Sequence, residues 1–145
     1  MSTQDKSAPE PLGKLLWQAH NWFRAAVTTS LGNDNGGVSP AHATLLSQLD
    51  PEGMPMAELA RRIGVSTPAI HQMVHRLVDL DILEIVPNPS SGRSKLVLLT
   101  PKGQTRRQEA LEVIAELEAK LAQHIGQRRV SALRDALEQD WTGAI

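Results

Sequence analysis

The chain has 145 residues, 41% of them hydrophobic, and a formal net charge of −1 at pH 7. This length suits one domain with a buried core, and the absence of cysteine excludes a disulfide framework and thiolate chemistry. No apolar run approaches the roughly 18 residues of a membrane span. Because the first ten residues also lack the apolar run of a signal peptide, we expect a cytoplasmic protein.

The N-terminal third predicts a tail, two helices and a loop. Residues 1–10 have no apolar run to anchor them and are predicted to be disordered. Apolar residues then recur at helical spacing from Pro11 to about Ser30, and the glycine-rich segment 31–38 indicates a loop. Ser39 followed by Pro40 favours a helix start with the serine as N-cap, and this helix is expected to end near residue 49.

The centre of the chain predicts a helix-turn-helix. A short helix is expected at Met56–Ile63, with Gly64 and Val65 in the turn and Ser66 capping the second helix. The predicted buried face of the second helix carries Ile70, Met73, Val74 and Leu77. The opposite face, free to meet a partner, carries Thr67, Ala69, His71, Gln72, His75 and Arg76. A second helix exposed in this way is typical of one that enters a DNA groove.

A β-hairpin and two more helices complete the predicted elements. Asp81 is expected to end the second helix, and strands are predicted at Ile82–Pro87 and Ser94–Leu99 around a turn. A long helix is predicted at about 102–125, and Gly126 separates it from a final helix. The apolar residues predicted on that final helix are Val130, Leu133, Leu137 and Trp141. The expected fold is mainly α with a small β-wing.

Charge is concentrated in the predicted helix-turn-helix and hairpin. Residues 54–107 hold eight basic residues against four acidic ones, a surplus of four positive charges, although the whole chain is slightly acidic. A basic centre between acidic flanks is typical of a DNA-facing module on a scaffold with another role.

Three stretches are specific enough to indicate a family. They are Glu58-Leu59-Ala60 through Gly64-Val65-Ser66, the pair Pro68-Ala69, and the end of the wing from Arg93 to Gly103. With one long helix before this core and two after it, the chain from residue 12 to about 141 resembles the MarR family of transcriptional regulators. The resemblance implies one domain over 11–145, with a winged helix-turn-helix core at about 38–103 and dimerisation helices at about 11–31 and 102–145.

The resemblance also implies partners. It implies an obligate homodimer that places two recognition helices on a pseudo-palindromic operator in double-stranded DNA. It further implies a small-molecule effector that binds between the dimer scaffold and the DNA-binding lobe and relieves repression. Three positions depart from the family pattern. Ser91 stands where the family usually has an acidic residue, two positions before Arg93. Pro55 replaces the Ser or Thr cap of the helix at 56–63, and Asp81 replaces a glycine.

Ten residues are candidates for contact with DNA. Ser66 and Thr67 add hydroxyl donors to the free N–H groups of a helix N-terminus, which can bind phosphate. Gln72 can bond bidentately to adenine, and the two histidines can reach base edges or only phosphate and water. Arg93 and Lys95, which lie on the predicted hairpin, could reach the DNA backbone or the minor groove. The full set is Ser66, Thr67, Pro68, His71, Gln72, His75, Arg76, Arg93, Ser94 and Lys95.

The other aromatic and histidine residues give weaker signals. Trp17, His20 and His42 are candidates for a ligand pocket, although packing of the tryptophan and internal hydrogen bonding of the histidines are the favoured interpretations. His71 and His75 form the single histidine pair at i,i+4 spacing, and neither cysteine nor a nearby carboxylate completes a zinc site. No metal and no cofactor is predicted.

Three classes of protein remain to be weighed. A dimeric DNA-binding regulator, acting as a ligand-relieved repressor, is the leading hypothesis. The alternative is a winged-helix module that binds protein without specific DNA binding, although the predicted recognition face carries no acidic residue that would favour it. An enzyme has no support, because the sequence has no nucleophile–base pair and no glycine-rich phosphate loop.

Overall fold

The computed structural model describes residues 8–32 and 36–144 of the chain. Most of the predicted tail, and residues 33–35 of the predicted loop, lie outside the described residues. The elements are α1 (Leu12–Leu31), α2 (Pro40–Gln48), β1 (Met54–Pro55), α3 (Met56–Ile63), α4 (Thr67–Asp79), β2 (Leu83–Pro87), β3 (Lys95–Leu99), α5 (Pro101–Ile125), α6 (Gln127–Leu137) and a short 3₁₀ helix, η1 (Thr142–Ala144). The prediction of a mainly α fold with a small β-wing is confirmed.

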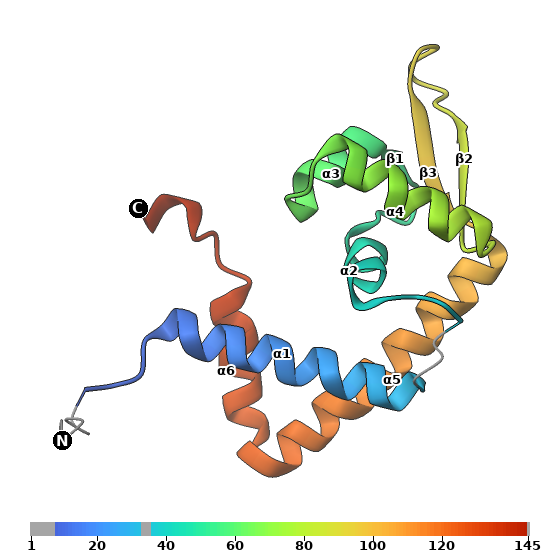
Figure 1. The fold of residues 1–145 in the computed structure, drawn as a ribbon. Helices are drawn as coiled ribbons and strands as arrows, with labels where there is room; N and C mark the ends of the chain where they lie inside the picture. Colours follow the sequence, from blue (N-terminus) through green and yellow to red (C-terminus); the bar gives the residue numbers. More distant parts are fainter. Residues whose placement is uncertain (1–7, 33–35, 145) are drawn as a thin grey trace, which may run out of the picture.

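The elements form two parts that α5 joins (Figure 1). One part, which we call the lobe, comprises α2, α3, α4 and a three-stranded antiparallel sheet in the order β1-β3-β2. The other part, which we call the scaffold, comprises α1, α5 and α6. The β2–β3 hairpin is the wing, and its tip extends from the lobe away from the scaffold (Figure 1). In the described part of the chain, no helix is long and apolar enough to cross a membrane.

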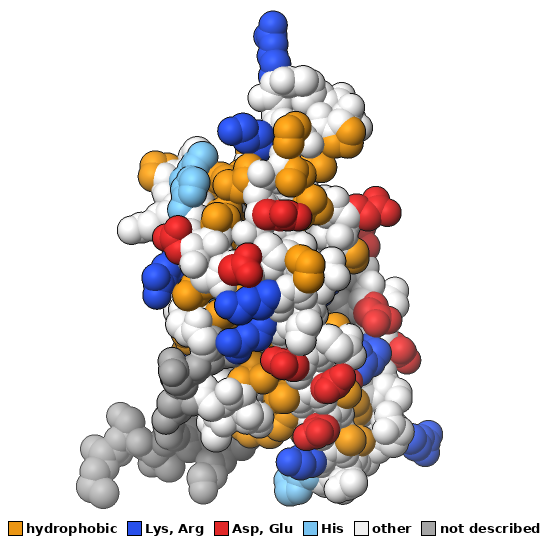
Figure 2. Space-filling view, turned by 90° about the vertical axis from the view of Figure 1, so that its right-hand side faces the viewer, with side chains coloured by type: hydrophobic (Ala, Val, Ile, Leu, Met, Phe, Trp, Pro, Cys, Tyr) orange, Lys and Arg blue, Asp and Glu red, His pale blue; other side chains and the backbone are white. Residues whose placement is uncertain are grey.

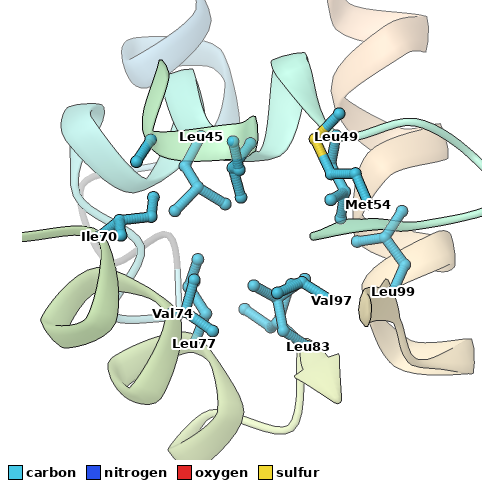
Figure 3. Packing of buried hydrophobic residues seen from close by; sticks show 12 residues of the cluster. Leu45, Leu49, Met54, Ile70, Val74, Leu77, Leu83, Val97 and Leu99 are labelled. Carbon is cyan, nitrogen blue, oxygen red and sulfur yellow. The ribbon is translucent and has the colours of Figure 1, made fainter. Parts of the chain in front are cut away.

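The hydrophobic core lies inside the lobe. Figure 3 shows side chains from α2, α4 and the sheet pointing toward one another. Leu45, Leu59, Ile70, Val74 and Leu77 have no exposed surface. Three of the four residues predicted for the inner face of α4 are therefore buried, and Met73 packs against this cluster as a half-buried residue. The close packing fixes the orientation of α4 relative to the rest of the lobe.

Side-chain caps start three of the helices. Ser39 accepts from the backbone N–H of His42 at 3.2 Å, Ser66 accepts from Ala69 at 3.3 Å, and Thr100 accepts from Gly103. Each hydroxyl satisfies a backbone donor that the first helical turn leaves free. The three predicted helix starts are confirmed to within one residue.

The scaffold leaves much of its apolar surface uncovered in the single chain. No residue of α1 is buried, whereas α5 and α6 bury Leu117 and Val130. An ion pair of 2.6 Å between Arg134 and Glu118 also joins α6 to α5. The large exposed hydrophobic side chains are Leu12, Leu15, Trp17, Trp22, Leu111, Leu133, Leu137 and Trp141. All of them belong to the scaffold or the segment that follows it.

The sequence missed one element and extended another too far. The strand β1 was not predicted, and it pairs with β3 through Met54 and Val97. The prediction that Trp141 lies on the final helix is wrong, because α6 ends at Leu137. Asp140 Oδ1 accepts from the backbone N–H of Thr142 at 2.9 Å, and this local hydrogen bond competes with continuation of the helix.

Smaller differences concern the ends of α4 and the strands. The helix ends at Asp79 and not at Asp81, and β2 and β3 each begin one residue later than predicted. Asp81 adopts a left-handed backbone with φ of 59°, as expected for a residue that replaces glycine in a turn. Its carbonyl oxygen accepts from Thr100 Oγ1 at 2.6 Å, which fastens the end of this turn to the start of α5.

Candidate nucleic-acid interface

The helix α4 presents a polar face to solvent beside the wing. Thr67, Pro68, His71, Gln72 and His75 are exposed, as is Arg76 one turn further on. Ala69, predicted for the same face, is half-buried. Because apolar residues recur at helical spacing, they lie on one side of α4 and the polar residues lie on the opposite side. Burial of the apolar side therefore directs the polar side toward solvent.

The turn before α4 holds the two helices of the motif close together. Gly64 adopts a left-handed backbone with φ of 70°, and Val65 N–H donates to Ala60 O at 3.1 Å. Ala60 is buried, and its small side chain suits the close approach of α3 and α4. Pro55 precedes α3 with no side-chain cap, in agreement with the departure noted in the sequence.

The exposed histidines of α4 lie against the base of the wing. The rings of His71 and His75 are stacked with centroids 6.2 Å apart. They line a surface hollow together with Ser94 and Lys95 of the hairpin. Figure 2 shows histidine side chains below the hairpin and a basic side chain extending from its tip. Polar side chains of the helix and of the wing therefore border one hollow, which Met56, Ile85 and Val97 also line.

The wing turn is closed by hydrogen bonds of Asn88. Its Nδ2 donates to Ser94 Oγ at 2.8 Å, and its Oδ1 accepts from the backbone N–H of Ser90 at 2.9 Å. Ser94, a predicted DNA contact, is half-buried and its hydroxyl is engaged in this turn. Sequence reasoning did not single out Asn88, whose position in a turn-rich segment was the available signal.

The wing arginine is free to bind an external group. Arg93 is exposed, and within residues 8–32 and 36–144 its guanidinium has no hydrogen bond or ion pair. Ser91 holds the turn by backbone bonds, its N–H donating to Asn88 O at 3.1 Å. At position 91, where the family resemblance implies an acidic partner for Arg93, this chain has a serine whose backbone closes the turn.

Several basic residues of the positive centre are engaged within the protein. Arg62 donates to both carboxylate oxygens of Asp50, at 2.8 and 3.0 Å, and Arg61 pairs with Glu58 at 2.6 Å. The hydrogen bond from Arg62 lowers the pKa of Asp50, and that from Arg61 lowers the pKa of Glu58. Both arginines belong to the basic surplus of residues 54–107, but their charge is locally compensated.

Two more basic residues of this centre fasten α5 to the lobe. Lys102 Nζ donates to Leu80 O at 2.9 Å, and Arg107 Nη1 donates to Leu49 O at 3.1 Å. The positive groups that remain exposed on the side of α4 and the wing are Arg76, Arg93 and Lys95. Of the eight basic residues in the positive centre, these three therefore remain available to bind DNA at the candidate interface.

A cavity lies between the lobe and the scaffold, where the resemblance implied an effector pocket. Leu31, Val38, Leu46, Leu111, Arg106 and Arg107 are among its lining residues. The predicted ligand contacts Trp17, His20 and His42 do not line it. Trp17 and His20 are exposed on α1, and His42 is half-buried at the start of α2. Their role in ligand binding stays a prediction.

Metal ligands do not converge in the described part of the chain. Within residues 8–32 and 36–144, no group of three or more His, Cys, Asp or Glu side chains could hold an ion. The histidine pair on α4 thus stands without a third ligand.

The recognition helix, the tight turn and the wing define a winged helix-turn-helix protein. A model of the MarR family matches residues 36–94, which span most of the lobe. A curated HTH-type transcriptional repressor from Mycobacterium tuberculosis is 29% identical over 111 residues, covering 77% of this chain and 79% of the repressor. Over this central region the chain is similar to the MarR family of regulators.

Solved structures agree with the fold. The reduced form of MarR from E. coli superposes with a TM-score of 0.75 at 23% identity, covering 91% of this chain and 97% of that chain. The transcriptional repressor CouR, solved with a 23-mer DNA duplex, gives a TM-score of 0.73 at 24% identity over 94% of this chain and 96% of that one.

Proposed function

We propose that this protein is a homodimeric, sequence-specific DNA-binding transcriptional regulator that acts as a repressor. The observation that carries the proposal is the exposed polar face of α4, which adjoins the wing, where Arg93 has no partner among residues 8–32 and 36–144. A helix of this kind fits the major groove, while a basic hairpin can reach the neighbouring backbone or minor groove. DNA as the partner would place the protein in the cytoplasm.

Each candidate contact has a distinct role in this proposal. Gln72 and the two histidines of α4 would contact base edges, and Ser66, Thr67 and Arg76 would contact phosphates. Arg93 and Lys95 would contact the backbone or the minor groove from the wing. Pro68 would fix the first turn of α4, where its missing N–H is tolerated. Ser94 would stabilise the wing turn through Asn88.

A dimer is supported by the exposed apolar surface of the scaffold. Trp17 is 67% exposed and Leu12 63% exposed in the single chain, and both lie on α1. Exposed large apolar side chains gathered on one part of a protein are typical of a protein–protein interface. A second copy of the chain would cover it and place two copies of α4 on successive half-sites of an operator.

A small-molecule effector would enter the cavity between the lobe and the scaffold. The cavity walls are mainly apolar, and Arg106 and Arg107 add charged groups. A ligand in this position would contact both parts of the protein and could alter their relative orientation. Release of bound DNA by added small molecules in a gel-shift assay tests this part of the proposal.

The proposed function is tested first by changing base-contacting side chains. The double variant Gln72→Ala/His75→Ala is expected to lose at least about 10-fold in affinity for specific DNA, since a good base contact contributes about 1–3 kcal/mol of discrimination. Binding is measured by gel shift against the DNA upstream of the protein's own coding sequence, followed by selection from a random DNA pool.

The control for this test is Gln104→Ala, which truncates an exposed glutamine of α5 outside the interface. This variant should bind as the native protein does. If neither the upstream DNA nor the selected pool yields a specific sequence, the alternative of a winged-helix module that contacts protein would replace the proposal. Equal binding by the native protein and the double variant would remove α4 from the interface.

The wing makes a separate prediction. Arg93→Ala is expected to weaken binding to all DNA sequences and to lower the slope of log affinity against log salt by about one, as loss of one phosphate contact does. Arg61→Ala is the matched control, because that exposed arginine is already paired with Glu58. An Arg93→Ala protein with native affinity and native salt slope would exclude the wing tip from DNA contact.

A further inference from the structure

The start of α2 has a reciprocal cap in which a histidine takes a position that usually holds Glu or Gln. His42 N–H donates to Ser39 Oγ at 3.2 Å, and Ser39 N–H donates to His42 Nδ1 at 3.3 Å. Ser39 Oγ also lies 3.0 Å from the same ring nitrogen. A backbone N–H can only donate, so Nδ1 must be unprotonated for the cap to be complete.

The surroundings of His42 disfavour a positive charge. The ring is half-buried, and a charge there would stand at a helix N-terminus, where the backbone dipoles favour negative groups. Arg76 of α4 is the charged side chain, among the described residues, that acts electrostatically on this ring. Burial, followed by the charge of Arg76, lowers the pKa of His42 from 6.5.

The cap lies where the loop from the scaffold enters the lobe. Gly37, just before it, adopts a left-handed backbone with φ of 80°. A Cβ at this glycine would lie 3.4 Å from Arg76 Nη2, so the arginine packs over the loop. On the scaffold side of the same loop, Arg106 of α5 packs against Gly36. Arg76 from α4 and Arg106 from α5 therefore lie against Gly37 and Gly36, the glycines that precede the cap of α2.

We propose that His42 is an acid-sensitive positioning residue: its protonation breaks the reciprocal cap of α2 and places a positive charge beside Arg76, which loosens the recognition helix. The proposal deepens the proposed function, on which it rests for its consequence in DNA binding. Its structural part concerns the stability of the lobe and stands without DNA. The core residue Leu45 on α2 has no exposed surface, so a disturbed α2 would disturb the core.

The direction of the pH effect follows from the lowered pKa. The fold favours neutral His42, so its contribution to stability is fully present at pH values well above 6.5, the ordinary pKa. This contribution is lost as the pH falls below 6.5 and through the lower pKa of the folded protein. DNA affinity depends on the interface itself as well as on the stability of the lobe. The two effects must be separated by a variant at position 42.

His42→Gln provides this separation, because glutamine can complete the same reciprocal cap without titrating. The full-length protein is unfolded with urea at pH 7.5 and pH 5.0, and the unfolding midpoints are compared. The native midpoint should fall further between these pH values than that of His42→Gln. His124→Gln removes an exposed histidine of α5 that bears no such cap, so its midpoint should follow the native one.

A second measurement follows the ring directly. Histidine NMR signals, assigned by their loss in His42→Gln, should show His42 titrating with a midpoint below 6.5, and Arg76→Gln should shift this midpoint upward. Equal loss of urea midpoint in the native and His42→Gln proteins, or a His42 titration at 6.5 or above, would overturn the proposal.

The consequence for DNA is measured as the ratio of affinities at pH 7.5 and pH 5.5. His42→Gln should retain a larger share of its neutral-pH affinity than the native protein, and both proteins keep His71 and His75. If the urea and NMR results hold while no DNA is bound specifically, the proposed function fails and the acid sensitivity of the lobe stands. If DNA is bound specifically and the native and His42→Gln proteins have equal affinity ratios, the role of His42 in DNA binding is wrong while the proposed function stands.

Discussion

Replacing Gly103 by alanine is expected to destabilise the lobe by at least about 3 kcal/mol, at the upper end of the cost of overpacking a core. Gly103 is buried in the first turn of α5, and a Cβ there would overlap the carbonyl oxygen of Ile82. That oxygen accepts from the Thr100 backbone N–H at 3.0 Å and from Thr100 Oγ1 at 3.2 Å. The carbonyl therefore cannot move away without breaking the bonds that hold the sheet to α5.

The measurement is urea unfolding followed by circular dichroism, with Gly13→Ala as the control. Beyond the neighbouring backbone of α1, a Cβ at Gly13 would meet no atom of residues 8–32 and 36–144 within 4 Å, so alanine should stabilise that helix by about 0.5–1 kcal/mol relative to glycine. The two Gly→Ala changes are chemically identical and have opposite expected signs. A Gly103→Ala protein as stable as the native one would mean that the close contact between α5 and Ile82 is absent.

Replacing Leu133 by aspartate is expected to convert the proposed dimer into a monomer and to reduce operator affinity by about 100-fold or more, because bivalent contact is lost. Leu133 lies on α6 and is 44% exposed in the single chain, beside Phe23 and Leu137. A buried aspartate without a partner would oppose association, whereas in a monomer the carboxylate would remain in water. The folded lobe should be unaffected.

Sedimentation at micromolar concentration and gel shift test this prediction together. Gln104→Asp adds the same charge at an exposed position of α5 and should remain dimeric with native affinity. A native protein that sediments as a monomer would contradict the dimer itself. A dimeric Leu133→Asp protein with unchanged affinity would place the interface elsewhere on the scaffold.

Features set by a few neighbouring residues could be predicted from the sequence. The caps at Ser39, Ser66 and Thr100 join groups only three residues apart, and a hydroxyl at such a position gives the helix start directly. The left-handed turn at Gly64 and the apolar spacing of α4 are equally local. The exposed face of α4, which carries most of the candidate site, follows from that spacing.

Features that join distant segments could not be predicted in this way. The pairing of Met54 with Val97 creates β1 from two residues that carry no strand pattern. Charge counting treated Arg62 and Arg93 alike, yet Arg62 is held by Asp50 and Arg93 has no partner within the described residues. The pairing of an arginine depends on which carboxylate the fold brings near it, and no local pattern reports that distance.

The sequence by itself determined the helix-turn-helix, the wing and the polar face that would meet DNA, because short-range hydrogen bonds and helical periodicity specify them. The tertiary structure decided which basic groups remain free at that face, that Gly103 must lack a side chain, and that His42 caps α2 beside Arg76. These depend on close approach between elements far apart in the chain. Packing of the core sets such distances, and they cannot be read from residue order.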